Sequence, residues 1–164
     1  MNKINKIILS ENLVYEGTVD MPKGWHVKKD DVVKHITVNS LYTNYTNTFC
    51  RELARVETYI LDYLRAEQKI KLETSIQNKG IFFERNERSK PFIEHNICDY
   101  VCLYGVQTDS DTCKVVINFD NNTYTKDLET DTFIIIPSRY MYYVENENNS
   151  LLNFINKFFF FIPS

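Results

Sequence analysis

The sequence predicts an α+β fold, mostly β, in which one amphipathic helix precedes an antiparallel sandwich, barrel or jelly roll. Two observations predict it. Apolar residues recur at spacings of three and four between residues 47 and 66, which is the period of a helix. From residue 71 onward, short runs of β-branched and aromatic residues alternate with polar turns, and strands at this density are typical of packed sheets.

The length and composition predict one domain. A chain of 164 residues with 43% hydrophobic content can bury a sizeable core without disulfides or metals. We expect a single domain over 1–164, with a lead-in and helix at 1–69 and the β core at 70–164. The lead-in is weakly patterned, with a strand-like run at residues 13–15 and a turn at residues 21–24.

The helix is expected from Asn47 to Ala66, with Thr46, Asn47 or Thr48 as its N-cap. The polar residues between the apolar positions, Glu57 among them, should form a solvated outer face. The apolar stripe should pack on a sheet, and it contains Phe49, Leu53, Val56, Ile60, Tyr63 and Leu64.

The strands are expected in eight runs after the helix. Polar residues at 109–111 and 120–122 have the chemistry of hairpin turns. The predicted strands are residues 71–76, 80–84, 100–106, 113–119, 123–126, 132–136, 140–145 and 151–161.

The last run is the strongest sign of assembly. Phe158, Phe159, Phe160 and Phe161 would present aromatic rings on both faces of a strand. One face can enter the core, whereas the other must meet either the chain's own helix or another protein chain, including a second copy of this one.

Charge and cysteine content exclude several classes of function. The net charge is −3 with both signs dispersed, so we expect no nucleic-acid or membrane partner. No apolar run is long enough for a membrane span or a signal peptide, and four glycines form no phosphate loop. Cys50, Cys98, Cys102 and Cys113 lack a zinc spacing and indicate reduced thiols in a cytoplasmic protein.

Two segments carry a family resemblance. Residues 92–104, which include His95, and residues 131–144 resemble the barrel core of the 2-oxoglutarate and iron(II) dependent oxygenases, in the prolyl-hydroxylase-like branch common in bacteriophages. The second segment ends in the run Pro137-Ser138-Arg139-Tyr140-Met141-Tyr142-Tyr143-Val144. The resemblance implies an antiparallel double-stranded β-helix, which is a jelly-roll or cupin-like barrel. It also implies a His-x-Asp pair and a later histidine that together bind iron.

Measured against that pattern, the metal site is degenerate. His95 matches the first histidine, but Ile97 stands in the carboxylate position and Tyr142 in that of the second histidine. Asp99 lies two residues beyond Ile97, too far along an extended strand to replace it. The family's cation for the far carboxylate of 2-oxoglutarate follows the second histidine by roughly ten positions, whereas the first cation after Tyr142 is Lys157.

These losses predict a barrel without cofactors that works through protein contacts. Tyr142 would plug the former iron position, with aromatic surface around it from Tyr100, Tyr104, Tyr140 and Tyr143. The asparagine-rich, alanine-poor composition is typical of AT-rich coding and favours a phage source. The leading hypothesis is a non-catalytic virion or tail-associated component, with phage structural proteins as partners, located in the host cytoplasm during assembly and then in the virion.

Two alternatives remain open. The first is an active iron(II) and 2-oxoglutarate dependent oxygenase with an atypical metal site, in which His26 or His35 joins Asp99 or Glu94. The second is a carbohydrate- or peptide-binding module that uses the aromatic rings at the barrel mouth as its platform.

Overall fold

The computed structural model describes residues 14–20, 30–34, 46–47, 51–83, 97–108, 113–119, 121–146 and 153–163, with the side chains of 46–47 and 75–83 left out. This part of the chain contains the strands β1 (Tyr15–Thr18), β2 (Thr46–Asn47), β3 (Glu73–Phe83), β4 (Tyr100–Gln107), β5 (Cys113–Phe119), β6 (Asn122–Asp127), β7 (Thr132–Pro137), β8 (Met141–Asn146) and β9 (Asn153–Phe161). It also contains the long helix α3 (Arg51–Gln68) and a short helical stretch at 30–34.

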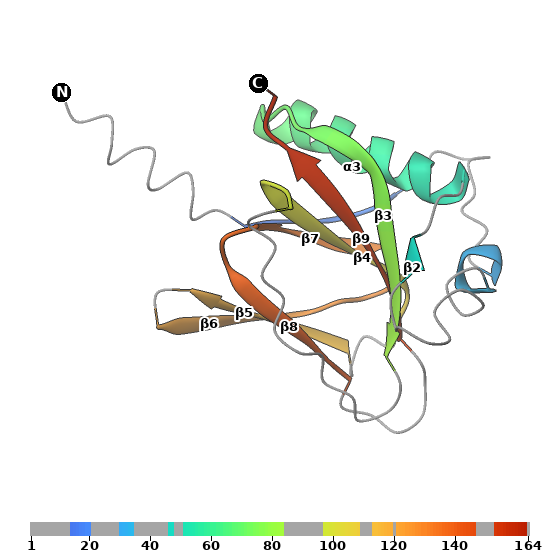
Figure 1. The fold of residues 1–164 in the computed structure, drawn as a ribbon, viewed down its shortest axis with the longest axis vertical. Helices are drawn as coiled ribbons and strands as arrows, with labels where there is room; N and C mark the ends of the chain where they lie inside the picture. Colours follow the sequence, from blue (N-terminus) through green and yellow to red (C-terminus); the bar gives the residue numbers. More distant parts are fainter. Residues whose placement is uncertain are drawn as a thin grey trace.

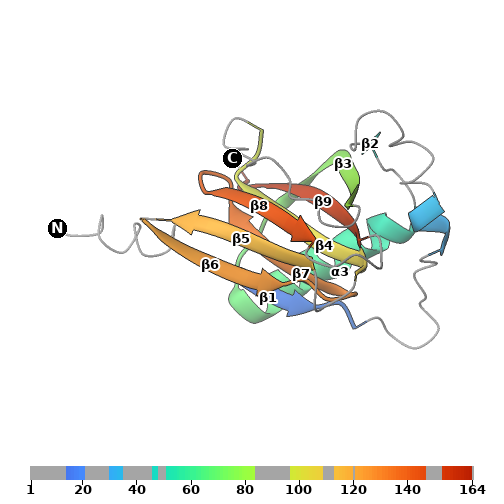
Figure 2. The ribbon, with the colours of Figure 1, turned by 90° about the horizontal axis from the view of Figure 1, so that it is seen from below.

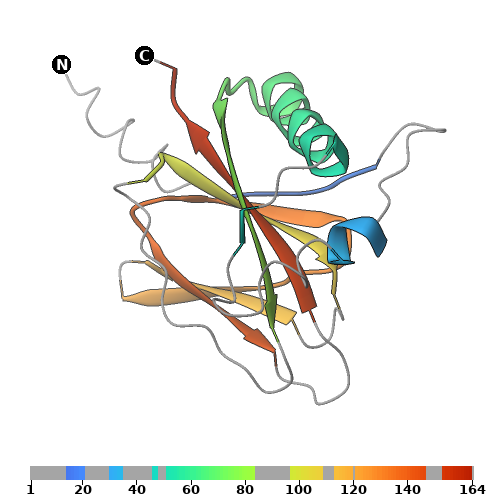
Figure 3. The same ribbon diagram turned by 45° about the vertical axis from the view of Figure 1, so that its right-hand side comes forward.

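The strands form two antiparallel sheets. Six strands form one sheet in the order β1-β7-β4-β9-β3-β2, and three form the other in the order β6-β5-β8. Helix α3 covers the outer face of the larger sheet, and the smaller sheet lies below it (Figure 1). Figures 2 and 3 show the same order of layers from below and from the side. The mostly-β, antiparallel fold class predicted from the sequence is confirmed.

Alternation along the strands separates two cores. Even-numbered residues of β9, such as Phe158, pack toward α3 together with Cys102 of β4 and Leu53 of the helix. Odd-numbered residues, such as Phe159, pack between the sheets together with Leu103 of β4. Every strand of the larger sheet that lies between the helix and the smaller sheet therefore needs apolar side chains on both faces.

The strand predictions agree closely with the observed strands. The runs at 71–76 and 80–84 are one strand, β3, whose pairing with β9 shifts register between Thr74 and Asn78. In the sequence, the polar residues near Asn78 indicate an interruption between two strands. The structure instead has one continuous strand with a bulge at this point. Asn121 forms the predicted β5–β6 turn with a φ of 64°, a left-handed conformation that asparagine tolerates.

The helix begins later than predicted. Residues 46 and 47 pair with Gly80 and Lys79 as strand β2, and α3 begins at Arg51, so the predicted start at Asn47 and its caps at Thr46 and Asn47 are wrong. Leu53, Val56, Ile60 and Leu64 are buried against the sheet, but Tyr63 is 40% exposed. Because its ring stacks on Tyr59 and meets Phe133 edge-on, Tyr63 lies at the border of the stripe.

Glu57 is buried within the apolar stripe of α3, contrary to the prediction of a solvated side chain. It is 7% exposed, and its Oε2 atom has no hydrogen-bond partner. Burial raises the pKa of the Glu57 carboxyl from 4.5 to about 7, although a hydrogen bond with the Thr74 side chain acts in the opposite direction. Glu57 lies four residues after Leu53 and three before Ile60, so its spacing places it on the stripe, whereas its charge led to the prediction of a solvated side chain.

Hydrogen bonds connect the turn before β7 to strand β4. The Tyr104 hydroxyl donates to Asp131 Oδ1 at 2.6 Å, and the Asp131 amide donates to the Gly105 carbonyl at 2.8 Å. A Cβ atom on Gly105 would lie 2.4 Å from the backbone oxygen of Glu129, so this position needs glycine for close approach. Burial raises the pKa of Tyr104, and the hydrogen bond to Asp131 raises it further.

Among the helices that the structure describes, none combines the length and apolarity needed to cross a membrane. Cys98, Cys102 and Cys113 are buried thiols outside any disulfide, and burial raises the pKa of Cys102. Cys50 lies outside the described residues.

Candidate functional site

The space between the two sheets contains a buried lysine. Lys157 of β9 is fully buried, and its register partner in β4 is Leu103, which belongs to the inter-sheet core. Its Nζ atom lies 5.2 Å from the centre of the Tyr142 ring, on β8 of the other sheet. A cation at this distance over a desolvated aromatic face is attracted to it.

The positions of Tyr142 and Lys157 within their strands explain why they meet. Tyr142 precedes the last residue of β8, Asn146, by four positions, and Lys157 follows the first residue of β9, Asn153, by four. Both side chains are buried between the facing sheets, where they come within 5.2 Å of one another. Their separation along the sequence gives no sign of this contact.

Among the residues that the structure describes, those predicted to stand at metal-ligand positions do not lie together. Tyr142 is 1% exposed in the core between the two sheets, whereas Ile97 is 49% exposed. His95 and the alternative donors His26, His35 and Glu94 lie outside the described residues. No group of three histidine, cysteine or acidic side chains that could hold a metal occurs among the residues described.

Asp99 has a structural role. Its Oδ2 atom accepts a hydrogen bond at 2.7 Å from the Ile162 amide, just beyond the end of β9. Its own amide donates to the Phe160 carbonyl, and its carbonyl accepts from the Ser138 amide. These bonds fix Asp99 to the β9 end and to the turn before β8.

The tyrosines predicted to surround Tyr142 are divided between different faces. Tyr100 and Tyr104 pack in the core beneath α3, on the far side of the larger sheet. Tyr143 alternates with Tyr142 along β8 and points to the opposite face of that strand. Of this set, Tyr140 shares the inter-sheet core with Tyr142.

The aromatic tail is covered by the chain itself. Phe158 and Phe160 are fully buried beneath α3, with their rings stacked at 6.3 Å. Phe159 is 2% exposed and Phe161 is partly buried, both on the inter-sheet side. Strand β9 lies between β3 and β4, and these two strands pair with both of its edges.

A pocket of about 440 Å³ opens where the edges of the two sheets approach one another. It is lined by Val14, Glu16, Ile117, Phe119, Tyr124 and Tyr140. Of these residues the sequence singled out Tyr140, because the others come from β5, β6, β1 and the residue before β1, and share no spacing that a linear motif would reveal.

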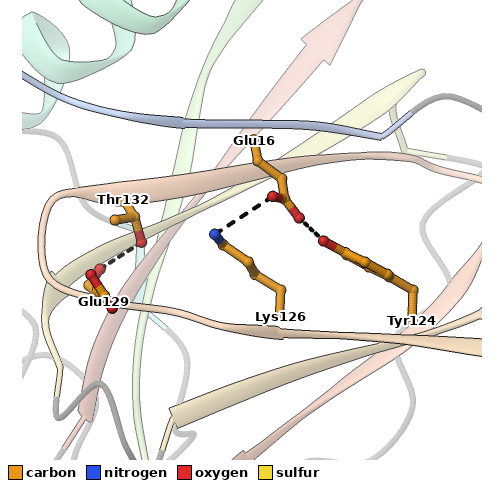
Figure 4. Close-up of polar contacts among 5 residues, drawn as sticks. All are labelled: Glu16, Tyr124, Lys126, Glu129 and Thr132. Carbon is orange, nitrogen blue, oxygen red and sulfur yellow. Dashed lines mark hydrogen bonds and ion pairs between the residues drawn. The ribbon is translucent and has the colours of Figure 1, made fainter.

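Glu16 connects the two sheet edges at this pocket. One carboxylate oxygen accepts a hydrogen bond from the Tyr124 hydroxyl, and the other lies 3.6 Å from Lys126 Nζ (Figure 4). The hydrogen bond to Glu16 raises the pKa of Tyr124 to about 12, so its phenol remains protonated and can donate. In the same view, the Thr132 hydroxyl donates to the Glu129 carbonyl at 2.8 Å and closes the turn into β7.

Comparison with known proteins identifies the fold. No protein-family model and no curated protein sequence matches this chain. Solved structures do match, beginning with the viral collagen prolyl hydroxylase of Paramecium bursaria Chlorella virus-1, with a TM-score of 0.64 and 9% identity over 92% of this chain and 97% of that one. A Pseudomonas putida prolyl-4-hydroxylase matches with a TM-score of 0.62 and 8% identity over 100% and 96% of the two chains.

A third similar structure contains ligands. HygX from Streptomyces hygroscopicus, with nickel and 2-oxoglutarate bound, matches with a TM-score of 0.62 and 8% identity over 99% of this chain and 87% of that one. The same protein has also been solved with iron bound. The chain therefore has the fold of the 2-oxoglutarate and iron(II) dependent oxygenases, as the sequence resemblance predicted.

The comparisons correct two predictions. The expected non-catalytic role as a phage structural component is wrong, because these structures of the same fold are hydroxylases and 2-oxoglutarate-binding proteins. The expectation of no cofactor is wrong for the same reason, since iron and 2-oxoglutarate occupy structures of this fold. The sequence count treated Lys157 as distant from Tyr142, whereas its Nζ atom lies 5.2 Å from the centre of that ring.

Proposed function

We propose that this protein is a 2-oxoglutarate dependent oxygenase with an atypical metal centre. The observation that carries the proposal is the position of Lys157, fully buried between the sheets and 5.2 Å from the ring of Tyr142. In this proposal the two sheets form the double-stranded β-helix barrel, α3 supports the larger sheet from outside, and the reaction takes place between the sheets.

Lys157 has the chemistry needed to hold the co-substrate. 2-Oxoglutarate has a carboxylate at each end, and the one remote from its keto group needs a cation deep in the site. A bound dicarboxylate would bring a carboxylate to this ammonium, and the low dielectric around Lys157 would strengthen their attraction.

The surroundings of Lys157 can exclude water. Ile155 and Phe159 flank it on β9, and Val144 follows Tyr142 on β8, all of them buried between the sheets. Tyr142 lies over the ammonium and limits the directions in which it can move. This chain therefore orients and desolvates one carboxylate, which is the contribution that a co-substrate anchor makes.

The described residues do not fit the usual iron centre of two histidines and one carboxylate. Tyr142 supplies a phenol instead of an imidazole, Ile97 is an exposed alkyl group, and Asp99 holds the Ile162 amide. When bound, iron would supply the oxygen chemistry of this class.

Anaerobic thermal unfolding tests the proposal. The protein is heated with Mn²⁺ alone, 2-oxoglutarate alone, and both together, with Mn²⁺ as an oxygen-stable substitute for iron. A ligand at a hundred times its dissociation constant should stabilise the folded state by about 2.7 kcal/mol. We expect 2-oxoglutarate to raise the melting temperature, and Mn²⁺ to increase that shift.

Two lysine variants test whether the change in melting temperature depends on Lys157. Lys157→Met should abolish the shift with 2-oxoglutarate, because it removes the buried ammonium and keeps an apolar side chain of similar length. Lys114→Met, on the partly exposed face of β5, should retain it. The assignment is contradicted if 2-oxoglutarate does not raise the melting temperature of the wild type. It is also contradicted if 2-oxoglutarate raises the melting temperatures of both variants equally. Oxygen-dependent consumption of 2-oxoglutarate with Fe²⁺ then tests turnover itself.

A further inference from the structure

The pocket beside Glu16 lies next to the proposed reaction site. Ile117 lines the pocket and is the register partner of Tyr142, so the two side chains are neighbours on the same face of the smaller sheet. Tyr140 also lines the pocket and packs in the inter-sheet core with Tyr142. A molecule in this pocket would therefore touch residues that adjoin the position of Lys157 and Tyr142.

The pocket walls are aromatic on more than one side. The rings of Phe119 and Tyr140 are 6.2 Å apart and inclined at 55°, and Tyr124 adds a third ring that is 39% exposed. The guanidinium of Arg139 lies 5.1 Å from the centre of the Tyr140 ring and donates to its hydroxyl at 3.2 Å, which holds that ring in place. Fixed rings at an angle suit a compact ligand with apolar C–H faces.

Of the residues that line the pocket, Glu16 is the charged one, and Lys126 beside the lining forms an ion pair with it. Glu16 is balanced by Lys126, and both side chains remain partly exposed, at 33% and 25%. The pair offers carboxylate acceptors and ammonium donors side by side, and the protonated Tyr124 phenol adds a hydroxyl. A charged ligand would have to displace one partner of this pair, whereas neighbouring hydroxyl groups on a neutral ligand can bond to both.

The size of the pocket limits the ligand to a compact molecule. A volume of about 440 Å³ is toward the lower end of the roughly 300–1,000 Å³ range of small-molecule sites. The lining combines the polar side chains of Glu16 and Tyr124 with aromatic and aliphatic groups. A compact ligand that has both apolar faces and hydroxyl groups matches this combination.

We infer that this pocket binds the substrate of the proposed oxygenase, and that the substrate is a neutral sugar or a molecule that carries one. That the bound molecule is a substrate rests on the proposed function. The binding of a sugar rests separately on the aromatic walls and the neutral Glu16–Lys126 pair. Phe119, Tyr124 and Tyr140 face the ring of the sugar, and Glu16 with Lys126 bonds its hydroxyl groups.

Saturation-transfer difference NMR tests this inference on the full chain. The probes are the methyl glycosides of glucose, galactose and rhamnose, with N-acetylproline N-methylamide as a peptide probe. We expect saturation on the ring protons of at least one glycoside. Tyr124→Ala and Glu16→Gln should each weaken binding at least five-fold, while Tyr63→Ala, which removes a similarly exposed tyrosine on α3, should leave it unchanged.

The outcomes separate the two proposals. The sugar inference is overturned if no glycoside binds, if Tyr124→Ala and Glu16→Gln bind as the wild type does, or if the peptide probe binds and loses affinity in these variants. The 2-oxoglutarate shift measured on Tyr124→Ala should remain, whereas Lys157→Met should lose that shift and keep glycoside binding. Glycoside binding by a protein that never binds 2-oxoglutarate would refute the oxygenase and the role as its substrate, while supporting the sugar site.

Discussion

Replacing Glu57 by glutamine should stabilise the protein above neutral pH. Glu57 lies inside the apolar stripe of α3 with Oε2 lacking a hydrogen-bond partner, and burial raises the pKa of its carboxyl from 4.5 to about 7. Glutamine has nearly the same shape, remains neutral at every pH, and can keep a hydrogen bond with Thr74. The variant therefore removes the charge without opening a cavity.

The direction in which the free energy of unfolding changes with pH follows from proton linkage. A carboxyl that binds protons more tightly when folded contributes full stability below the unfolded pKa of 4.5, and loses it as pH rises through the folded pKa of about 7. At 1.36 kcal/mol for each pKa unit, the loss corresponds to about 3 kcal/mol. Because water reaches the 7% of Glu57 that remains exposed, we expect a smaller value of about 2 kcal/mol.

Urea unfolding followed by circular dichroism at pH 5 and pH 8 measures the effect. Glu57→Gln should exceed the wild type by about 2 kcal/mol at pH 8, and by less than about 1 kcal/mol at pH 5. Glu67→Gln removes an exposed carboxylate from the same helix and should change stability little at either pH. A Glu57→Gln advantage that is equal at both values, or a variant less stable than the wild type at pH 8, would refute the reasoning.

Three further predictions concern the packing. Gly105→Ala should destabilise the protein by at least about 2 kcal/mol in urea unfolding, because its Cβ would meet the Glu129 backbone at 2.4 Å. Tyr104→Phe should cost about 1–2 kcal/mol by losing its 2.6 Å bond to Asp131, and unchanged stability would show that the bond contributes nothing net. Ile60→Ala should cost about 2–5 kcal/mol by opening a cavity between α3 and the sheet, measured by the same unfolding curves.

The elements were largely predictable from the sequence, because strand runs and helical spacing are local signals. The strand predicted at 113–119 matches β5 in both bounds, and 132–136 falls one residue short of β7. Glu57 was predicted to be solvated because it is charged, although its spacing from Leu53 and Ile60 follows the apolar stripe that the sheet covers.

The candidate site was less predictable, because it depends on depth within the barrel. Lys157 was dismissed by its distance along the sequence from Tyr142, but the two are equally far from the β8–β9 connection and meet across the sheets. Glu16 and Tyr124 are 108 positions apart, and their contact follows from two sheet edges that no local pattern brings together. Longer connections change sequence spacing without changing the position of a side chain in its strand.

The central position of β9 has a consequence for how the protein is made. Strands β3 and β4 each pair with β9 but not with one another, so the larger sheet has a gap between them until β9 is inserted. During synthesis, eight strands and α3 emerge before the strand that joins them, and Phe158 and Phe160 cannot cover the helix stripe until then. Pairings this distant in sequence form slowly. The emerging chain therefore exposes the edges of β3 and β4, and nascent-chain aggregation or chaperone binding should fall once β9 has been made.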